Sequence, residues 1–237
     1  MILFFIPSYN DHELVSSLAE SLLIENPQSQ LLVIDDGSSV PIRLDVEYAL
    51  RQRVALYRLE TNAGLGLATS IAIDHFLLSS CSVFVRLDSD GQHPVSEVSR
   101  LVEPVVRGDA DLVWAQRQHS VSGPRAAGID ALRMGSKAAT RWLAQRALGC
   151  SHSDWFSGFF ALSREAALRY ESDHLERYCE VQMLCLAFSR ALRVRTIMVG
   201  QLDRLHGEST IKLFGGLMVV LRAWLLILVH ATRKARP

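Results

Sequence analysis

The stretch that decides the fold is VFVRLDSDGQHP, residues 83–94, in which a short apolar run ends in two carboxylates one residue apart. The run 83–85 is typical of a strand buried on both faces. A strand that ends in Asp-x-Asp places hard oxygen ligands at the carboxyl edge of a sheet, where open α/β folds bind their ligands. Asp88 and Asp90 therefore indicate a site for a divalent cation that already holds a diphosphate. The alternative is an ordinary polar turn, because Asp, Ser and Gly are common turn residues.

Similar apolar runs recur along the chain and alternate with segments of helical spacing. The predicted strands are residues 2–6, 31–34, 54–57, 83–85 and 112–114, and the predicted helices are residues 11–25, 65–78 and 95–106. Asp11 is available as the cap of the first helix and Pro94 as the start of the third. This alternation predicts an α/β fold, a mostly parallel sheet flanked by helices, with its function in the loops at the carboxyl ends of the strands.

The loops that follow the first four predicted strands share a polar character. They are residues 7–11, 35–39, 61–66 and 88–94, and each supplies carboxylates, amides or glycines that let backbone N–H groups approach a ligand. Because such loops converge on one edge of a parallel sheet, they predict a site for a nucleotide diphosphate. The carboxylates of Asp35 and Asp36 can accept hydrogen bonds from a base or a ribose there.

The composition points to no nucleic-acid partner. Among 237 residues, Lys plus Arg and Asp plus Glu both number 25. From residue 211 onward the chain holds basic residues and no acid, so the preceding part carries a net negative charge.

The four cysteines have no metal-type spacing, which fits reduced thiols in a cytosolic protein. The apolar start, residues 1–6, is too short for a signal peptide, and we expect the protein inside the cell.

A longer set of motifs runs in order along the chain. It comprises Pro7-Ser8-Tyr9-Asn10, Asp35-Asp36-Gly37-Ser38, Asn62-Ala63-Gly64-Leu65-Gly66, Asp88-Ser89-Asp90-Gly91-Gln92-His93-Pro94, Arg117, Arg133 with Ser136, Asp154-Trp155-Phe156-Ser157-Gly158-Phe159, and Arg204-Leu205-His206-Gly207-Glu208-Ser209. This set resembles glycosyltransferase family 2, in the branch that contains dolichyl-phosphate mannose synthases and bacterial polyprenyl-phosphate sugar transferases. The resemblance implies a GT-A type, Rossmann-like domain in residues 1–210, followed by an apolar helix with a basic tail in residues 211–237.

The resemblance also implies roles for particular residues in an inverting transfer from a nucleotide-diphosphate sugar to a polyprenyl phosphate. The donor would be bound by Pro7, Tyr9, Asn10, Asp35, Asp36, Gly64 and Asp88. Mg²⁺ or Mn²⁺ would be bound by Asp88, Asp90 and Gln92. The catalytic residues would be Asp90, Asp154 and Arg117, and the acceptor phosphate would be bound by Arg117, Arg133, Ser136 and Arg204. Thr210 departs from the pattern, because the synthases tend to have Lys at this position.

The basic residues of the segment 115–150 bear on the acceptor. If residues 129–148 form a helix, Arg133, Lys137 and Arg141 share one face beside Ser136, and Trp142 is expected on the opposite, core-facing side. This face is either a phosphate site or an ordinary solvated surface.

The acceptor's chemistry decides whether a general base is needed. A phosphate acceptor is largely ionised at neutral pH and attacks without a base, whereas a sugar or lipid hydroxyl would need one, for which Asp154 or Glu180 is available. A third hypothesis is that the protein is a subunit that binds a nucleotide sugar but catalyses no transfer.

The end of the chain, residues 213–229, is nearly all apolar but is interrupted by Arg222. A central Arg costs roughly 2.5 to 3.5 kcal/mol in a spanning helix, so a membrane span is disfavoured. The segment predicts a helix that lies in the membrane interface, where the basic tail would attract anionic headgroups at the inner face. The alternative is a helix that packs on the domain or on a second subunit of a homo-oligomer.

Overall fold

The computed structural model describes residues 1–11, 14–118, 127–150, 154–171, 174–177, 179–200 and 213–234, with side chains left undescribed at 117–118, 127–134, 213–217 and 233–234. Within these ranges the chain forms one seven-stranded sheet in the order β3-β2-β1-β4-β6-β5-β7. The strands are β1 Ile2–Ser8, β2 Gln30–Asp35, β3 Val54–Arg58, β4 Val83–Arg86, β5 Leu112–Gln118, β6 Phe160–Ser163 and β7 Val194–Gly200. All pairings are parallel except those of β6, which is antiparallel to β4 and β5.

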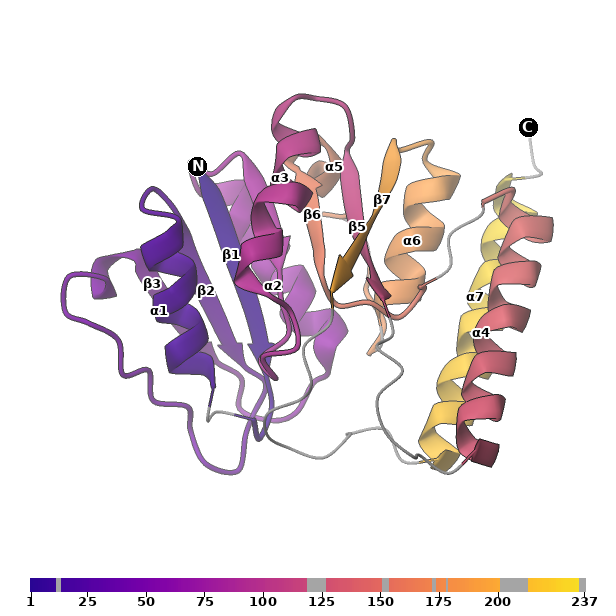
Figure 1. Cartoon of the computed structure of the whole chain (residues 1–237), viewed down its shortest axis with the longest axis horizontal. Coiled ribbons are helices and arrows are strands. Elements are labelled where there is room, and N and C mark those ends of the chain that lie inside the picture. Colours follow the sequence, from indigo (N-terminus) through magenta and orange to yellow (C-terminus); the bar gives the residue numbers. More distant parts are fainter. Residues whose placement is uncertain are drawn as a thin grey trace.

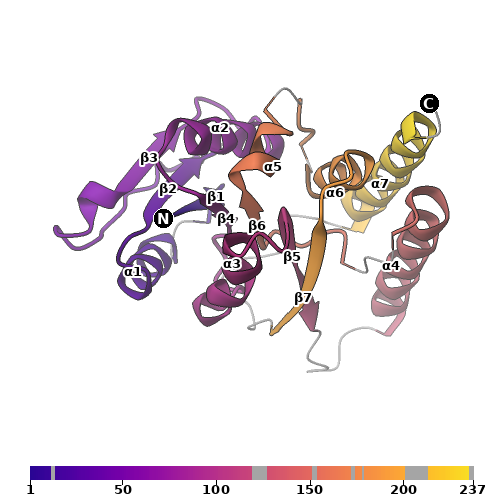
Figure 2. The same ribbon diagram turned by 90° about the horizontal axis from the view of Figure 1, so that it is seen from above.

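Helices cover both faces of the sheet, as Figure 2 shows, because alternate strand residues point to opposite sides. In β1, Leu3 and Phe5 join one buried cluster, whereas Phe4 and Ile6 join the other. Helices α1 (Val15–Glu25) and α3 (Val98–Val106) cover one face. Helices α2 (Leu65–Leu78), α5 (Arg164–Leu168) and α6 (Cys179–Ser189) cover the other face, which confirms the predicted layered α/β fold.

Two long helices, α4 (Ala127–Leu148) and α7 (Leu213–Lys234), stand side by side at the end of the sheet near α6 (Figure 1). Among the described side chains of α4, those of Thr140, Ala144 and Leu148 are buried. The indole N–H of Trp224 on α7 donates a 2.9 Å hydrogen bond to the Thr140 hydroxyl. Trp142 was expected to face the core, but it is 66% exposed. The expectation is wrong because the i, i+4 stripe through Thr140 faces α7, and a residue two positions on points away from it.

The predicted boundaries mostly match those of the observed elements, but several elements differ. Strand β6 was not predicted, because four residues next to a loop motif carry too little pattern to indicate a strand. The helix α1 begins at Val15, and its N-cap is Leu14 without a side-chain hydrogen bond, so Asp11 is not its cap. Pro94 is the N-cap of the 3₁₀ turn η2 (Val95–Glu97), which leads into α3, so it does not start α3 itself. A second such turn, η1 (Arg51–Arg53), precedes β3.

The helix α7 extends beyond the predicted segment, to Lys234, and packs against α4 and α6. None of the helices in the described part of the chain is both long and apolar enough to cross a membrane. The division between residues 1–210 and 211–237 stays a prediction.

Candidate functional site

The sheet reverses its strand order between β1 and β4, since β2 and β3 lie on one side of β1 and β4 lies on the other. Open α/β sheets bind ligands in the crevice beside the carboxyl ends at this point. The loop after β4 carries Asp88 and Asp90, and the loop after β1 carries Tyr9, Asn10 and Asp11. The Ser89 hydroxyl donates a 3.2 Å hydrogen bond to Asp11 Oδ2, which ties the two loops together across the crevice.

The loops after β1 and β2 are joined by a reciprocal pair of hydrogen bonds. The Asn10 N–H donates to the Ser38 hydroxyl at 2.9 Å, and the Ser39 N–H donates to Asn10 Oδ1 at 2.8 Å. Asn10 has a φ of 53°, a left-handed conformation that Asn adopts more easily than most residues. Tyr9 is 41% exposed beside this junction, and Pro7 lies within β1 opposite Ile34.

Asp35 is buried and holds its own loop in place. Its carboxylate accepts hydrogen bonds from the N–H groups of Ser38 at 2.9 Å and Ile42 at 3.2 Å, and it pairs with Arg58 at 2.6 Å. Burial alone would raise the pKa of Asp35, but the Ser38 and Ile42 hydrogen bonds and Arg58 together hold it below its ordinary value. Asp35 is therefore a carboxylate at neutral pH, and its role toward a nucleoside stays a prediction.

Asp36 connects the second loop to the third. Its two oxygens accept the N–H groups of Ala63 at 2.8 Å and Gly64 at 2.9 Å. Gly64 has a φ of +94°, and a Cβ there would lie 2.5 Å from Arg177 Cγ, so this position suits only glycine. The four predicted loops thus meet at one edge of the sheet, as the sequence indicates.

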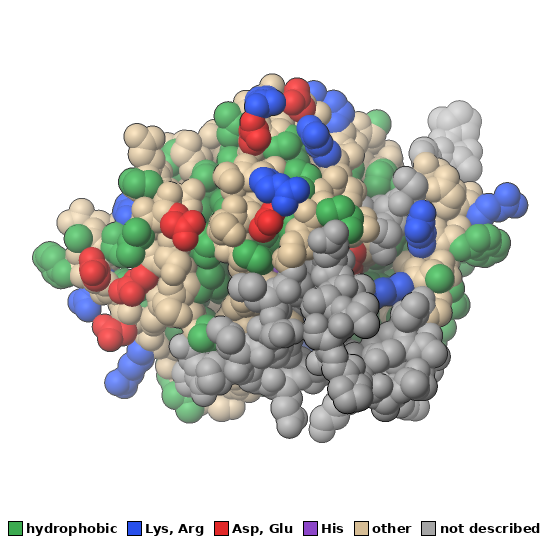
Figure 3. All heavy atoms as spheres, viewed as in Figure 1, with side chains coloured by type: hydrophobic (Ala, Val, Ile, Leu, Met, Phe, Trp, Pro, Cys, Tyr) green, Lys and Arg blue, Asp and Glu red, His purple; other side chains and the backbone are tan. Residues whose placement is uncertain are grey.

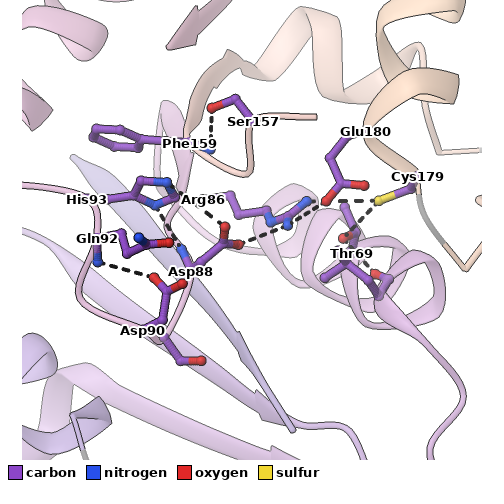
Figure 4. Close-up of polar contacts among 12 residues, drawn as sticks. Thr69, Arg86, Asp88, Asp90, Gln92, His93, Ser157, Phe159, Cys179 and Glu180 are labelled. Carbon is purple, nitrogen blue, oxygen red and sulfur yellow. Dashed lines mark hydrogen bonds and ion pairs between the residues drawn. The ribbon is translucent and has the colours of Figure 1, made fainter. Parts of the chain in front are cut away.

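Asp88 is held by a buried cation that sequence reasoning missed. Arg86 is only 1% exposed, and its Nη2 lies 3.0 Å from Asp88 Oδ1 and 2.9 Å from Glu180 Oε1 (Figure 4). Burial disfavours the charged form of Arg86, but Glu180 and Asp88 raise its pKa above its ordinary value, so the guanidinium stays protonated. The signal in the sequence was an Arg inside an apolar strand, which requires a buried partner.

The loop before β6 approaches the other side of Asp88. A Cβ added to Gly158 would lie 2.3 Å from both carboxylate oxygens of Asp88, so only a residue without a side chain lets this carboxylate sit where it does. His93 lies on the same side: its Nδ1 accepts the Asp88 N–H at 3.2 Å, and its ring stacks on Phe159 with centroids 4.9 Å apart. The Nε2 atom of His93 lies 3.9 Å from Asp88 Oδ2.

Asp90 and Gln92 lie together in the next turn of the same loop (Figure 4). The Gln92 N–H donates a 3.1 Å hydrogen bond to Asp90 Oδ1, and Asp90 is 9% exposed. Among the residues that the structure describes, no cluster of three or more His, Cys, Asp or Glu side chains could hold a metal ion by itself. The donor set of two carboxylates and one amide still fits Mg²⁺ or Mn²⁺, since Mg²⁺ uses one or two carboxylates and completes its shell with substrate phosphates and water.

The predicted acceptor residues are only partly described. Arg117 lies in β5 and Arg133 in α4, but both side chains fall outside the described part of the structure, as does all of Arg204. Ser136 is half-buried, and its carbonyl accepts the Thr140 hydroxyl at 2.8 Å. Arg141 and Arg146 are exposed on α4, and Figure 3 shows basic side chains at the edge of the molecule where α4 lies.

Asp154 and Glu180 occupy different surroundings. Asp154 is 5% exposed, and its carbonyl accepts the indole N–H of Trp114 at 3.1 Å. Glu180 lies in the first turn of α6 and pairs with Arg86, so it belongs to the Asp88 side of the site.

The sequence profile of glycosyl transferase family 2 matches residues 4–169, and the chain belongs to this family. The polyprenol monophosphomannose synthase of Mycolicibacterium smegmatis is 35% identical over 118 residues, which cover 48% of this chain and 44% of that protein. The chain thus spans less than half the length of this relative. The undecaprenyl-phosphate mannosyltransferase of Micrococcus luteus is 27% identical over 222 residues, covering 92% of this chain and 89% of that protein.

Solved structures support the fold. The glucosyl-3-phosphoglycerate synthase of Mycobacterium tuberculosis, crystallised with Mn²⁺, uridine diphosphate and phosphoglyceric acid, superposes with a TM-score of 0.67. The superposition covers 98% of this chain and 78% of that one at 20% identity. The chain therefore shares the fold of this synthase.

Proposed function

We propose that this protein is a metal-dependent inverting glycosyltransferase that moves a sugar from a nucleotide-diphosphate donor to a polyprenyl phosphate. The observation that carries the proposal is the Asp88 and Asp90 pair in the loop after β4, at the point where the sheet reverses its strand order. The names of the mycobacterial and micrococcal relatives support the lipid-phosphate acceptor.

On the donor side, Asp88, Asp90 and Gln92 would hold Mg²⁺ or Mn²⁺ through their oxygen atoms. The bound ion supplies Lewis-acid stabilisation of the departing nucleoside diphosphate. Tyr9 offers an exposed aromatic face on which a base can stack. The other residues expected to bind the donor form the loops around this site or hold those loops together. They are Pro7, Asn10, Asp35, Asp36 and Gly64.

On the acceptor side, Arg117, Arg133, Ser136 and Arg204 would hold the phosphate. An ionised phosphate oxygen attacks the anomeric carbon directly, so the protein has to align the nucleophile but does not have to remove a proton from it. Asp154 would then not be needed as a base.

Turnover with defined acceptors tests this function. The purified full chain is expected to transfer sugar from a nucleotide-diphosphate sugar to undecaprenyl phosphate with Mn²⁺ present, as measured by radiolabelled lipid product across the common donors. Asp154→Asn is expected to keep the rate within about tenfold of the unmodified protein, because base catalysis contributes at least about 10²-fold where it is used. A larger loss, with the variant still folded, would show that the acceptor is a hydroxyl. Donor binding without any transfer would show a non-catalytic subunit.

We also propose that α7 attaches the protein to the inner face of the membrane. Its outer side exposes Met218, Leu221, Leu225, Leu228 and Val229, which are 39% to 62% exposed and recur at helical spacing. Arg222 is exposed on the same helix, and the sequence continues into Arg233, Lys234 and Arg236. An apolar stripe with adjoining cations fits an interface that contains anionic lipids.

Vesicle sedimentation checks this attachment. The protein is expected to bind phosphatidylglycerol-containing vesicles, less so at high salt, and Leu225→Glu is expected to weaken binding by about tenfold or more through the lost burial of one leucine. Leu78→Glu is the matched control, because Leu78 is 90% exposed at the end of α2. Equal binding by the two variants contradicts the attachment. If Leu225→Glu halved the particle mass in solution, the apolar stripe would instead be the contact with a second copy of the chain.

A further inference from the structure

Arg86 occupies an unusual position between the donor site and α6. Its side chain is fully enclosed, with the guanidinium carbon 5.8 Å from the centre of the Phe160 ring and Nη1 4.0 Å from the Cys179 sulfur. Its Nε has no hydrogen-bond partner among the described residues. The charged contacts of Arg86 are therefore concentrated on Nη2, which Asp88 and Glu180 share.

This sharing gives the two carboxylates different tasks. The Asp88 side chain is 36% exposed and can reach a ligand, whereas the Glu180 side chain is 12% exposed. A buried cation beside a cation-binding carboxylate would repel a divalent ion, unless another negative charge balances it. Glu180 provides that charge, so the Arg86–Glu180 pair is neutral as a unit and Asp88 keeps its negative charge for a ligand.

We propose that Arg86 is a positioning residue that fixes the Asp88 carboxylate toward a divalent cation and its diphosphate, and that Glu180 is the counter-charge that keeps Arg86 from neutralising Asp88. The inference rests on the proposed function in one respect, namely that the ligand of Asp88 is a cation–diphosphate pair. It assigns Arg86 and Glu180 no contact with substrate.

Two variants separate the two roles. Among the described residues, Glu180→Gln leaves Arg86 with Asp88 as its only salt-bridge partner. We expect this variant to weaken Mn²⁺ binding about tenfold, the effect of one neighbouring charge. The matched control is Glu176→Gln, which removes an exposed carboxylate from the segment just before α6. In the double variant Arg86→Met with Glu180→Leu the local net charge is unchanged, but the Asp88 carboxylate loses its contact with Arg86, so we expect Mn²⁺ binding to fall several-fold. Apolar replacement of a buried ion pair is often neutral or stabilising, so the fold should survive.

The readout is the Mn²⁺ dissociation constant, measured by electron paramagnetic resonance with UDP and with GDP, alongside the thermal unfolding midpoint. If Arg86 only stabilised the fold, the midpoint would change while Mn²⁺ affinity stayed the same, and the inference would be wrong. Equal affinities for Glu180→Gln and Glu176→Gln would overturn the counter-charge role. If the unmodified protein bound no Mn²⁺ with either nucleotide, the proposed function itself would fail.

Discussion

Asp90→Asn is expected to lower the rate of sugar transfer by about 10³-fold, the largest effect that a single polar substitution should have in this protein. The Asp90 carboxylate is the proposed cation ligand, and an amide oxygen binds a divalent ion much more weakly than a carboxylate. Asn retains an oxygen that can accept the Gln92 N–H, so the turn should keep its shape. The loss would therefore report on the cation rather than on folding.

The measurement is the initial rate at saturating donor over a series of Mn²⁺ concentrations. Asp109→Asn is the control, because Asp109 is an exposed carboxylate in the turn before β5, at the opposite edge of the sheet. If Asp90→Asn retained more than a tenth of the rate at the Mn²⁺ optimum of the unmodified protein, Asp90 would not be the cation ligand. The thermal midpoint of both variants should stay close to that of the unmodified protein.

Local patterns were sufficient to predict most of the fold. The helix α2 has the predicted bounds, and the observed strands β1 to β5 contain the predicted runs, because buried parallel strands and the helices between them each leave a periodic signal in the sequence. The convergence of four polar loops followed from that alternation alone. The loops meet through side chains such as Asn10, Asp36 and Ser89, whose residue types were already indicative of a polar edge.

What could not be predicted depends on contacts between distant segments. Strand β6 is placed antiparallel between β4 and β5 by pairing across the sheet, and its own sequence does not determine that order. Glu180 could be interpreted as an ordinary helix residue until its contact with Arg86 was known, because the two lie 94 positions apart in the chain. The exposure of Trp142 likewise depends on which face of α4 meets α7.

Gly158→Ala is expected to reduce transfer by about 10²-fold through displacement of Asp88, since misplacing a reacting group by about 1 Å can cost that much. The new methyl group would lie 2.3 Å from both oxygens of the Asp88 carboxylate, and that side chain is exposed enough to swing away. Gly158 does not have a positive φ, so alanine introduces no backbone strain at this position. The effect should therefore fall on the position of the carboxylate.

In Gly158→Ala, activity should fall much more than stability. When Asp88 moves, Arg86 keeps its contact with Glu180, so the free energy of unfolding should fall by only about 1 to 2 kcal/mol, as for a typical substitution. Gly135→Ala provides the control, because Gly135 lies within the helix α4 and a Cβ there meets no described atom within 4 Å. It should be neutral or slightly stabilising, since Ala favours a helix over Gly. Full activity of Gly158→Ala would mean that sugar transfer does not require Asp88 at its observed position. The proposed positioning of Asp88 by Arg86 would then have no role in catalysis.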